Sequence, residues 1–258
     1  MPLNSALDRE PKVVYKTREI LVLSKCEKSS RLSDISIMTV PSQNTETLRR
    51  IPQQARSRER VNLILDAAAQ VFEEVGYEAA STELIAACAQ TSIGSLYRFF
   101  PDKSTILFAL AERFAEQMRQ LFTTTFNAAA VDNPLAKVLS ETVDAFDRLY
   151  TTEPGCRTVM LQSRVSPELQ AVNGRVDREI VIQLEAFFAL RQPTMKPEQR
   201  RLVALISVEI AGALQLLSLA QDQQLQQQIV AETKQVLIRY LSPLFPDREQ
   251  TANRALID

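Results

Sequence analysis

The stretch that decides the fold runs from residue 81 to residue 100 and reads Ser81-Thr82-Glu83-Leu84-Ile85-Ala86-Ala87-Cys88-Ala89-Gln90-Thr91-Ser92-Ile93-Gly94-Ser95-Leu96-Tyr97-Arg98-Phe99-Phe100. Ser81 and Ser92 can each cap a short helix, because a serine hydroxyl accepts a hydrogen bond from a free backbone amide of the first turn. Leu84 and Ile85 then point inward from the first helix and Leu96 from the second. Two short helices joined by about three residues predict a helix-turn-helix, a motif whose second helix fits a DNA major groove.

The remaining sequence indicates an all-α fold. The chain has 258 residues, 45% of them hydrophobic, and can therefore bury one sizeable core or two modest ones. It contains only five glycines, whereas a strand-rich protein of this length needs many more for its turns. From Gln53 the apolar side chains recur every 3.6 residues, and Gly76 stands where a C-terminal cap belongs. A first helix is expected to end at Val75.

Further helices are marked by their starts. Asp102 is placed to cap a helix from Lys103 to about Thr125. Later starts carry a proline in the first turn, at Pro134, Pro167 and Pro197. The expected helices cover residues 134–151, 156–163, 167–190, 197–220 and 223–241.

Residues 1 to about 50 mix charged and apolar residues without a sustained period, which predicts a mobile extension. An internal methionine, Met38, leaves two interpretations open. The natural start lies there, or the extension is a genuine disordered arm.

Composition excludes several classes of function. Histidine is absent, which removes the commonest general base and a common zinc and iron ligand. No phosphate-binding glycine loop and no convincing setting for a nucleophile is found. Glu141, Asp144 and Asp147 lie about one turn apart, but a solvated acidic face explains them better than a cation site. We expect no enzyme, no catalytic residues, no cofactor and no metal.

The cysteines and the charge indicate an intracellular protein. Cys26, Cys88 and Cys156 are scattered and odd in number, which favours a reducing compartment over a disulfide framework, with Cys88 in the core. No run approaches the roughly 18 apolar residues of a membrane span, and no signal peptide is evident. We expect a soluble, cytoplasmic protein.

The net charge of −1 means that any DNA contact must come from a local patch.

A longer run sharpens the interpretation. The residues Gly94-Ser95-Leu96-Tyr97-Arg98-Phe99-Phe100-Pro101-Asp102-Lys103 resemble the end of the recognition helix and the start of the next helix in TetR-family (AcrR-like) regulators. The upstream residues that match the same pattern are Ile64-Leu65-Asp66-Ala67-Ala68, Phe72, Gly76-Tyr77 and Ile85-Ala86. The specific resemblance covers about residues 57–117, and the rest matches only in its helical layout.

The resemblance implies the domain organisation. Residues 1–52 form the N-terminal extension, and 53–117 a three-helix DNA-binding domain with its motif at 81–100. Residues 118–245 form a helical effector-binding and dimerisation domain, and 246–258 a tail.

The resemblance also implies DNA-contacting residues. Ile93, Gly94 and Ser95, next to Ser92, face the groove at the start of the recognition helix. The Tyr97 hydroxyl and the Lys103 ammonium reach phosphates, and Thr82 offers its amide or hydroxyl to another. Arg56 and Arg58 belong to a basic cluster that can reach the backbone or the minor groove. For the neighbouring Arg49 and Arg50, a solvated helix end is an equal alternative.

One residue departs from the family pattern. The turn commonly reads Gly-Val-Ser and here reads Gln90-Thr91-Ser92. If Gln90 must adopt a positive φ, it costs about 1 kcal/mol relative to glycine, which the fold can tolerate.

The second half suits a dimer with a pocket. The 197–220 segment is apolar nearly all the way round and the 223–241 segment is amphipathic, which suits the intersubunit four-helix bundle usual in the family. Interface candidates are Leu205, Gly212, Leu216 and Leu237. Effector-pocket candidates are Phe146, Met160, Phe187 and Phe188, each of which plain core packing also explains. Glu209 can meet a ligand amine or an interface arginine, and the interface is favoured.

These features predict a sequence-specific transcriptional regulator, a ligand-released repressor that binds a palindromic double-stranded DNA operator as a homodimer. Its effector is an unidentified small molecule. The alternative is a helical small-molecule-binding or adaptor protein that has lost DNA binding. Tyr97 and Lys103 favour the DNA-binding interpretation.

Overall fold

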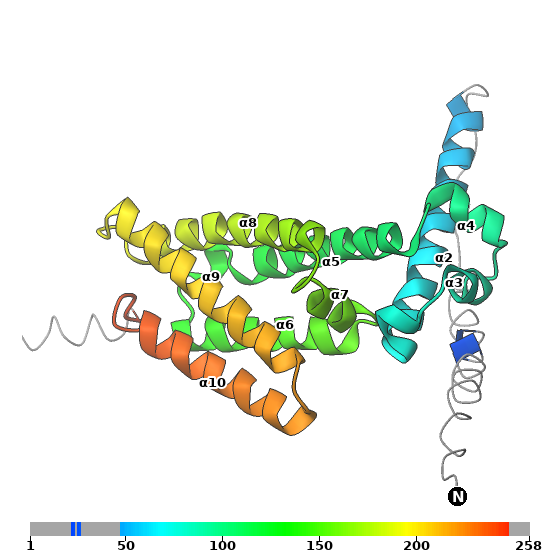
Figure 1. Ribbon diagram of the computed structural model, residues 1–258. Coiled ribbons are helices and arrows are strands. Elements are labelled where there is room, and N and C mark those ends of the chain that lie inside the picture. The colour runs from blue at the N-terminus through cyan, green and yellow to red at the C-terminus, as the bar shows by residue number, and fades with distance from the viewer. Residues whose placement is uncertain (1–21, 24, 27–46, 248–258) are drawn as a thin grey trace, which may run out of the picture. The chain divides into compact units, whose positions relative to one another are not determined.

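The computed structural model describes residues 22, 23, 25, 26 and 47–247, with the backbone alone for 47–54. All regular structure in this part of the chain is helical, as expected (Figure 1). The chain divides into two compact units, residues 1–110 and 111–258.

From residue 47 on, the described part of the first unit contains three helices and the start of a fourth. They are α2 (Thr47–Ala79), α3 (Thr82–Cys88), α4 (Ile93–Phe99) and the beginning of α5 (Lys103–Thr125). Helix α2 begins earlier than the expected Gln53. Its regular part is interrupted at Gly76, whose φ of 80° and ψ of 164° are not helical. Such a φ favours glycine, so the first regular helix ends where the sequence predicts.

The core of this unit is formed by apolar side chains that recur at helical spacing. Almost no surface remains exposed on Ile64, Ala68, Phe72, Ile85, Leu96, Ile106 and Leu110. Each large side chain buried in this way stabilises the fold by about 1.5–3 kcal/mol relative to an exposed position. The single buried residue of α4 is Leu96, so the short second helix of the motif is held mainly by this side chain.

The predicted N-terminal caps are confirmed. The Ser81 Oγ accepts a hydrogen bond from the Leu84 amide at 3.1 Å, and the Ser92 Oγ accepts one from the Ser95 amide at 3.2 Å. The Asp102 Oδ1 accepts from the Thr105 amide at 2.7 Å and from the hydroxyls of Ser104 and Thr105. The hydrogen bond from the Ser104 side chain, followed by those from the Thr105 amide and hydroxyl, lowers the pKa of Asp102 below its usual value.

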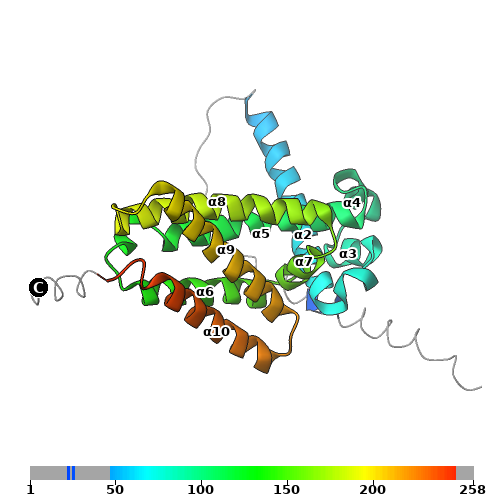
Figure 2. The same ribbon diagram turned by 60° about the vertical axis from the view of Figure 1, so that its left-hand side comes forward.

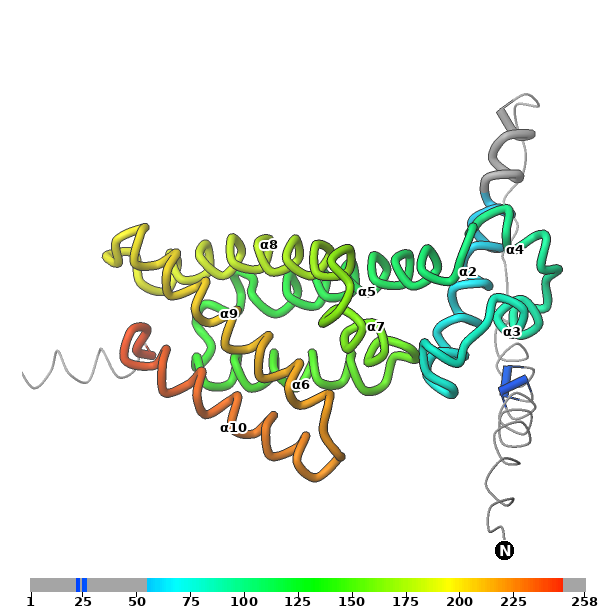
Figure 3. The backbone as a smooth tube through the Cα atoms, in the orientation of Figure 1, coloured from blue at the N-terminus to red at the C-terminus, as the bar shows by residue number. Residues whose placement is uncertain are grey.

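The second unit contains the rest of α5 and five further α-helices. These are α6 (Leu135–Thr152), α7 (Cys156–Gln162), α8 (Pro167–Arg191), α9 (Pro197–Leu219) and α10 (Gln223–Leu241). Their bounds agree with the predicted ranges to within a residue. A short 3₁₀ turn at Ala128–Ala130, capped by Asn127, was not predicted. Helix α9 packs against both α8 and α10, and α10 also packs against α6 (Figures 2 and 3).

Ion pairs and aromatic contacts fix these helices. Arg175 of α8 pairs with Glu112 of α5 at 2.5 Å, and Lys234 of α10 pairs with Asp144 of α6 at 2.5 Å. A chain of ring contacts, 4.2–6.3 Å between centroids, joins Phe126, Phe187, Phe188 and Phe245. Asp247, in the predicted tail, accepts hydrogen bonds from the Leu135 amide at 2.9 Å and from Arg191 at 2.8 Å.

Helix α9 is less buried than its composition suggests. By length and composition alone it could cross a membrane, which differs from the expectation that no segment resembles a span. Only a third of its most apolar 18-residue window is buried within the subunit. Leu202, Leu205 and Leu217 are largely exposed, and so are Leu225 and Val236 of α10. These five residues make up the apolar surface of α9 and α10, defined as the large apolar side chains on these two helices that the subunit itself does not cover.

The cysteine prediction was wrong for two of the three residues. Cys26 and Cys88 form a disulfide, and both are buried. Val22, one turn before Cys26, is also buried, so this part of the expected extension packs on the first unit. The Lys25 ammonium pairs with the Glu74 carboxylate at 2.5 Å. The sequence concealed the pair because the two cysteines are 62 positions apart and the total is odd. The predictions for residues 1–21 and 27–46, Met38 included, and for 248–258 lie outside the described residues.

The disulfide predicts a measurable thiol count and a stability difference. Protein purified without reductant and unfolded in guanidinium should show one thiol reactive to Ellman's reagent, that of Cys156, rather than three. Reduction should lower the midpoint of thermal unfolding by several degrees. A cross-link over a loop of this size lowers the entropy of the unfolded chain, which raises the free energy of unfolding by up to about 4 kcal/mol. A Cys26→Ser/Cys88→Ser variant serves as the control and should not respond to reductant. Three reactive thiols before reduction would contradict the disulfide.

Candidate nucleic-acid interface and ligand pocket

The outer face of α4 is polar and open. Ile93 and Tyr97 are 37% and 46% exposed, and Gly94 is exposed between them. No heavy atom lies within 4 Å of the position that a Cβ on Gly94 would occupy. Leu96, on the opposite side of the helix, is fully buried. Because α4 is anchored from one side only, its other face can approach another molecule.

Two hydroxyls lie together beside this face. The Thr82 Oγ1, from the first residue of α3, and the Tyr97 Oη of α4 are 3.0 Å apart and share a hydrogen bond. The structure thus brings together two of the residues that the sequence predicts to contact phosphates. A hydroxyl that shares one hydrogen bond in this way still has capacity to bond an anionic oxygen.

Lys103 occupies a different setting from the one expected. Its ammonium donates to the backbone carbonyls of Tyr77 at 2.7 Å, Glu78 at 3.2 Å and Ala80 at 2.9 Å. It also lies 4.4 Å from the centre of the Tyr77 ring. A lysine ammonium has three N–H groups, and here each has a carbonyl partner. This geometry gives Lys103 a structural role at the end of α2, while its phosphate contact stays a prediction.

The turn of the motif adopts the strained conformation considered from the sequence. Gln90 has a φ of 51°, the sole positive φ outside glycine in the described residues. The Thr91 amide donates to the Ala86 carbonyl at 3.0 Å, and the Gln90 amide donates to the Ala87 carbonyl at 3.1 Å. This pair of hydrogen bonds is the Schellman motif, in which the position of Gln90 usually holds glycine. Arg60 of α2 donates to the Thr91 hydroxyl at 3.2 Å and holds the turn from outside.

The basic cluster is open to solvent where it is described. Arg56 and Arg58 of α2 are both exposed, so their guanidinium groups are available to an anionic partner. The side chains of Arg49 and Arg50 lie outside the described part of the structure.

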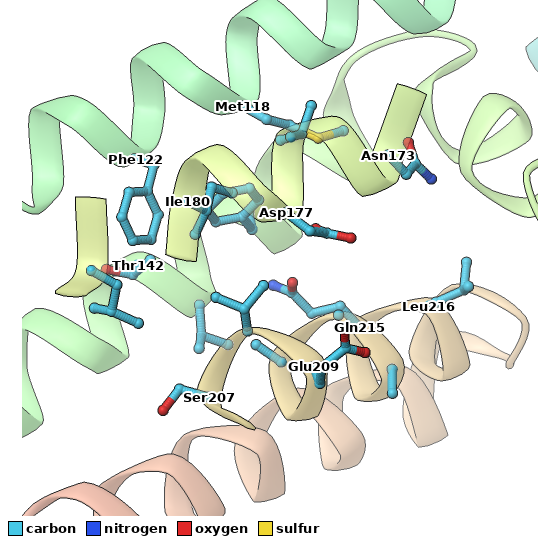
Figure 4. A pocket seen from close by; sticks show the side chains of 18 of the residues that line it. Met118, Phe122, Thr142, Asn173, Asp177, Ile180, Ser207, Glu209, Gln215 and Leu216 are labelled. Carbon is cyan, nitrogen blue, oxygen red and sulfur yellow. The ribbon is translucent and has the colours of Figure 1, made fainter. Parts of the chain in front are cut away.

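A cavity of about 450 Å³ lies in the second unit (Figure 4). Its volume is in the range of sites for small molecules. It is mainly apolar, and the walls come from α5, α6, α7, α8, α9 and α10. The lining includes Met118, Phe122, Leu139, Val143, Phe146, Tyr150, Met160, Val176, Ile180, Leu184, Val208, Leu216, Leu237 and Leu241.

The predicted pocket residues divide into two pairs. Phe146 and Met160 line the cavity. Phe187 and Phe188 do not line it; their rings join Phe126, which does line it, to Phe245. The helical spacing of α8 identifies these phenylalanines as buried, but it does not indicate which cluster they join.

The predicted interface residues also divide. Leu205 is 45% exposed and Gly212 is exposed, so both are available on the outside of α9. Leu216 is partly buried, and both it and Gly212 also line the cavity. Leu237 departs from the expectation, because it is only 4% exposed and faces the cavity inside its own subunit.

The sequence interpretation considered Glu209 as a ligand contact, although it favoured the interface, and it missed the other polar groups of the cavity. Asp177 and Glu209 both line it, together with Gln215. Burial, and then the negative charge of Glu209, raise the pKa of Asp177 to about 6. The Asp177 side chain is nevertheless exposed to solvent. Burial likewise raises the pKa of the Tyr150 hydroxyl well above its usual value. The available signal was the position of Asp177 between Val176 and Ile180, two members of the apolar stripe of α8.

Replacing Gln90 by glycine should stabilise the first unit. Glycine adopts a positive φ without the steric cost of a Cβ, so Gln90→Gly should raise the unfolding free energy by up to about 1 kcal/mol. The matched control is Ala87→Gly, three residues earlier on the exposed side of α3, which should lower it by about 1 kcal/mol. Urea unfolding followed by circular dichroism measures both changes. A Gln90→Gly variant as destabilised as Ala87→Gly would contradict the geometry of the turn.

Replacing Lys103 should reveal a structural role. Lys103→Met keeps most of the apolar stem but leaves three carbonyls without their charged donor, so the unfolding free energy of the first unit should fall by about 2 kcal/mol. Lys137→Met removes an exposed lysine of α6 and is the control. Unchanged stability accompanied by weaker DNA binding would instead assign Lys103 to a phosphate contact.

Known protein families match both units. The description "Bacterial regulatory proteins, tetR family" matches residues 64–110, and "Tetracyclin repressor-like, C-terminal domain" matches residues 134–241. The first match contains the helix-turn-helix, and the second contains α6 to α10.

Individual relatives agree with this assignment. The chain is 29% identical over 120 residues to the HTH-type transcriptional repressor KstR of Mycolicibacterium smegmatis, a match that covers 46% of this chain and 57% of that protein. A TetR-family transcriptional regulator from Streptomyces coelicolor is 28% identical, with a TM-score of 0.53 over 71% of this chain and 98% of its own. A TetR-family regulator from Pectobacterium atrosepticum, 20% identical, shares the fold with a TM-score of 0.58 over 74% of this chain and 97% of its own. Both units therefore carry the family's signature, and the chain belongs to the TetR family of bacterial transcriptional regulators.

Proposed function

We propose that this regulator is a repressor that binds a palindromic operator as a homodimer and is released when a small molecule enters its cavity. The observation that carries the DNA-binding half is the open face of α4 beside the paired hydroxyls of Thr82 and Tyr97. Hydroxyls and exposed arginines are groups that contact phosphates and fix a protein on DNA. Ile93 can contact a thymine methyl group, and Ser95 can bond a base edge. An operator as the target implies action in the cytoplasm.

The uncovered apolar surface of α9 and α10 supports the dimer. An apolar surface of this kind marks an interface in a protein that must remain in solution. Two-fold symmetry would present two copies of α4 to two half-sites, which a single small helix-turn-helix needs for selectivity. Leu205 and Gly212 are the predicted interface residues that lie on the exposed side.

The continuity of α5 supports ligand control. Its later residues Met118 and Phe122 line the cavity, while its earlier residues Ile106 and Leu110 are buried in the unit that contains the helix-turn-helix. A ligand shifts an equilibrium only by its difference in affinity for the two states. A ligand that displaces the wall formed by α5 would therefore act on the helix that also leads into the DNA-binding unit.

The test is a binding titration of DNA from the region upstream of the chain's own gene, followed by fluorescence anisotropy across a salt series. Affinity should fall as salt rises. Tyr97→Phe should weaken binding about tenfold at every salt concentration, because it removes one hydrogen bond to a charged oxygen. Replacing Arg56 and Arg58 by alanine should lower the magnitude of the salt slope by about 2, or about 1 for each phosphate that an arginine no longer neutralises.

Lys137→Ala, which removes a charge from the second unit, is the control and should leave both affinity and slope unchanged. The mass of the complex should correspond to two protomers on one operator. Absence of binding to this DNA and to a pool of genomic fragments, even at low salt, would overturn the proposal in favour of a helical ligand-binding or adaptor protein.

A further inference from the structure

The cavity of the second unit combines an apolar wall with acidic groups. Aromatic and aliphatic side chains from α5 and α6 form one side, among them Phe122 and Phe146. Asp177 of α8 and Glu209 of α9 add two carboxylates to the lining of the same cavity (Figure 4). A mainly apolar site with a few converging polar groups is the usual form of a small-molecule site.

The two carboxylates are not neutralised within the subunit. In the part of the chain that the structure describes, neither Asp177 nor Glu209 makes a hydrogen bond or an ion pair. Arg178, next to Asp177, lowers the pKa of that carboxyl, but burial and Glu209 together raise it by more. Two like charges beside a low-dielectric wall disfavour each other's ionised state. A positive group placed between them would relieve this repulsion.

A side-chain amide also faces the cavity. Gln215 of α9 is 7% exposed, and among the described residues its side-chain amide makes no hydrogen bond (Figure 4). Its polar atoms are not fully buried, so a ligand that enters the cavity can take the place of water as their partner. Its carbonyl oxygen can accept from an N–H group, as can the two carboxylates.

Among the described residues, the one positive side chain of the lining does not make the net charge of the cavity positive. Arg164 is the cationic member of the lining, and its Nη2 donates to the Leu216 carbonyl at 3.3 Å. With two carboxylates and one guanidinium, the lining carries a net negative charge. Both carboxylates are exposed to solvent, so a neutral ligand would leave them hydrated and an anionic ligand would be repelled, whereas a cation would be attracted.

We propose that the effector is an amphiphilic organic cation, with its ammonium group between Asp177 and Glu209 and its apolar part against Phe122 and Phe146. The aromatic rings favour such a ligand further, because a cation is attracted to the face of a ring. This inference rests on the proposed ligand control, since it names the chemical class of ligand for the same cavity.

The experiment measures binding of three probes with the same ten-carbon chain by isothermal titration calorimetry at pH 8. Decyltrimethylammonium is the cation, decyldimethylamine oxide the neutral analogue and decyl sulfate the anion, each below its micellar concentration. The cation should bind at least about tenfold more tightly than either analogue. Asp177→Asn and Glu209→Gln should each weaken its binding about tenfold and leave the neutral analogue unaffected.

The matched control is Glu185→Gln, which removes a carboxylate of α8 that does not line the cavity and should change nothing. Both cavity variants remove a repulsion, so they should fold at least as stably as the wild type, as thermal unfolding at pH 8 will show. If the Asp177→Asn variant unfolded at a lower temperature than the wild type, this would contradict the inference that the Asp177 carboxylate has no stabilising partner within the subunit.

Acidification provides an independent readout. The cation requires ionised Asp177, so its affinity should decrease as the pH falls from 8 to 5 through the pKa of about 6, and this decrease should be smaller in Asp177→Asn. The charged or titratable groups around Asp177 are Glu209 on α9, Arg178 on its own helix, Tyr150 on α6 and Arg164 after α7. Helix α5 contributes only uncharged side chains to this lining.

Several outcomes would overturn the inference. Equal or tighter binding of the neutral or anionic probe would leave ligand control intact but assign another ligand class. If Glu209→Gln changed the mass of the protein in solution without changing its affinity for the cation, Glu209 would belong to an interface. If the cation bound as expected but left the affinity for DNA unchanged, the cation site would stand and the proposed release mechanism would fail.

Discussion

The first unit depends on the contact between one ammonium group and the end of one helix. Helix α2 ends at a break, and the carbonyls that follow its last regular turn have no partners within the helix. Lys103 donates to three of these carbonyls and also packs over the Tyr77 ring. Because Lys103 is the first residue of α5, this contact sets the start of α5 against the end of α2. Helices α3 and α4 lie in the chain between these two points and are positioned by the same constraint.

Much of this fold could be predicted because helix ends have local chemical causes. Ser81, Ser92 and Asp102 each cap a helix within three residues of their own position, so the sequence alone identifies those starts. The positive φ of Gln90 was considered from the family resemblance, because glycine commonly stands at this position of the turn.

The remainder depends on contacts between residues far apart in the chain. Nothing near Cys26 indicates Cys88, and nothing near Lys103 indicates that it meets the end of α2 rather than a phosphate. Periodicity identified Phe187, Phe188 and Leu237 as apolar positions, yet the choice between core, cavity and interface is made by the neighbouring helices. Asp177 was missed because a single carboxylate beside an apolar stripe is usually solvated, and its setting becomes evident only when Glu209 faces it.

The negative charge of the cavity lining also determines which small molecules the cavity excludes. Many small metabolites in a bacterial cell are carboxylates or phosphates. A purely apolar cavity would admit the acyl chains among them. Asp177 and Glu209 oppose their entry by charge alone, and discrimination against unwanted ligands often rests on such repulsive groups. The two acidic residues would thus prevent anionic metabolites from binding in the cavity and acting on the regulator.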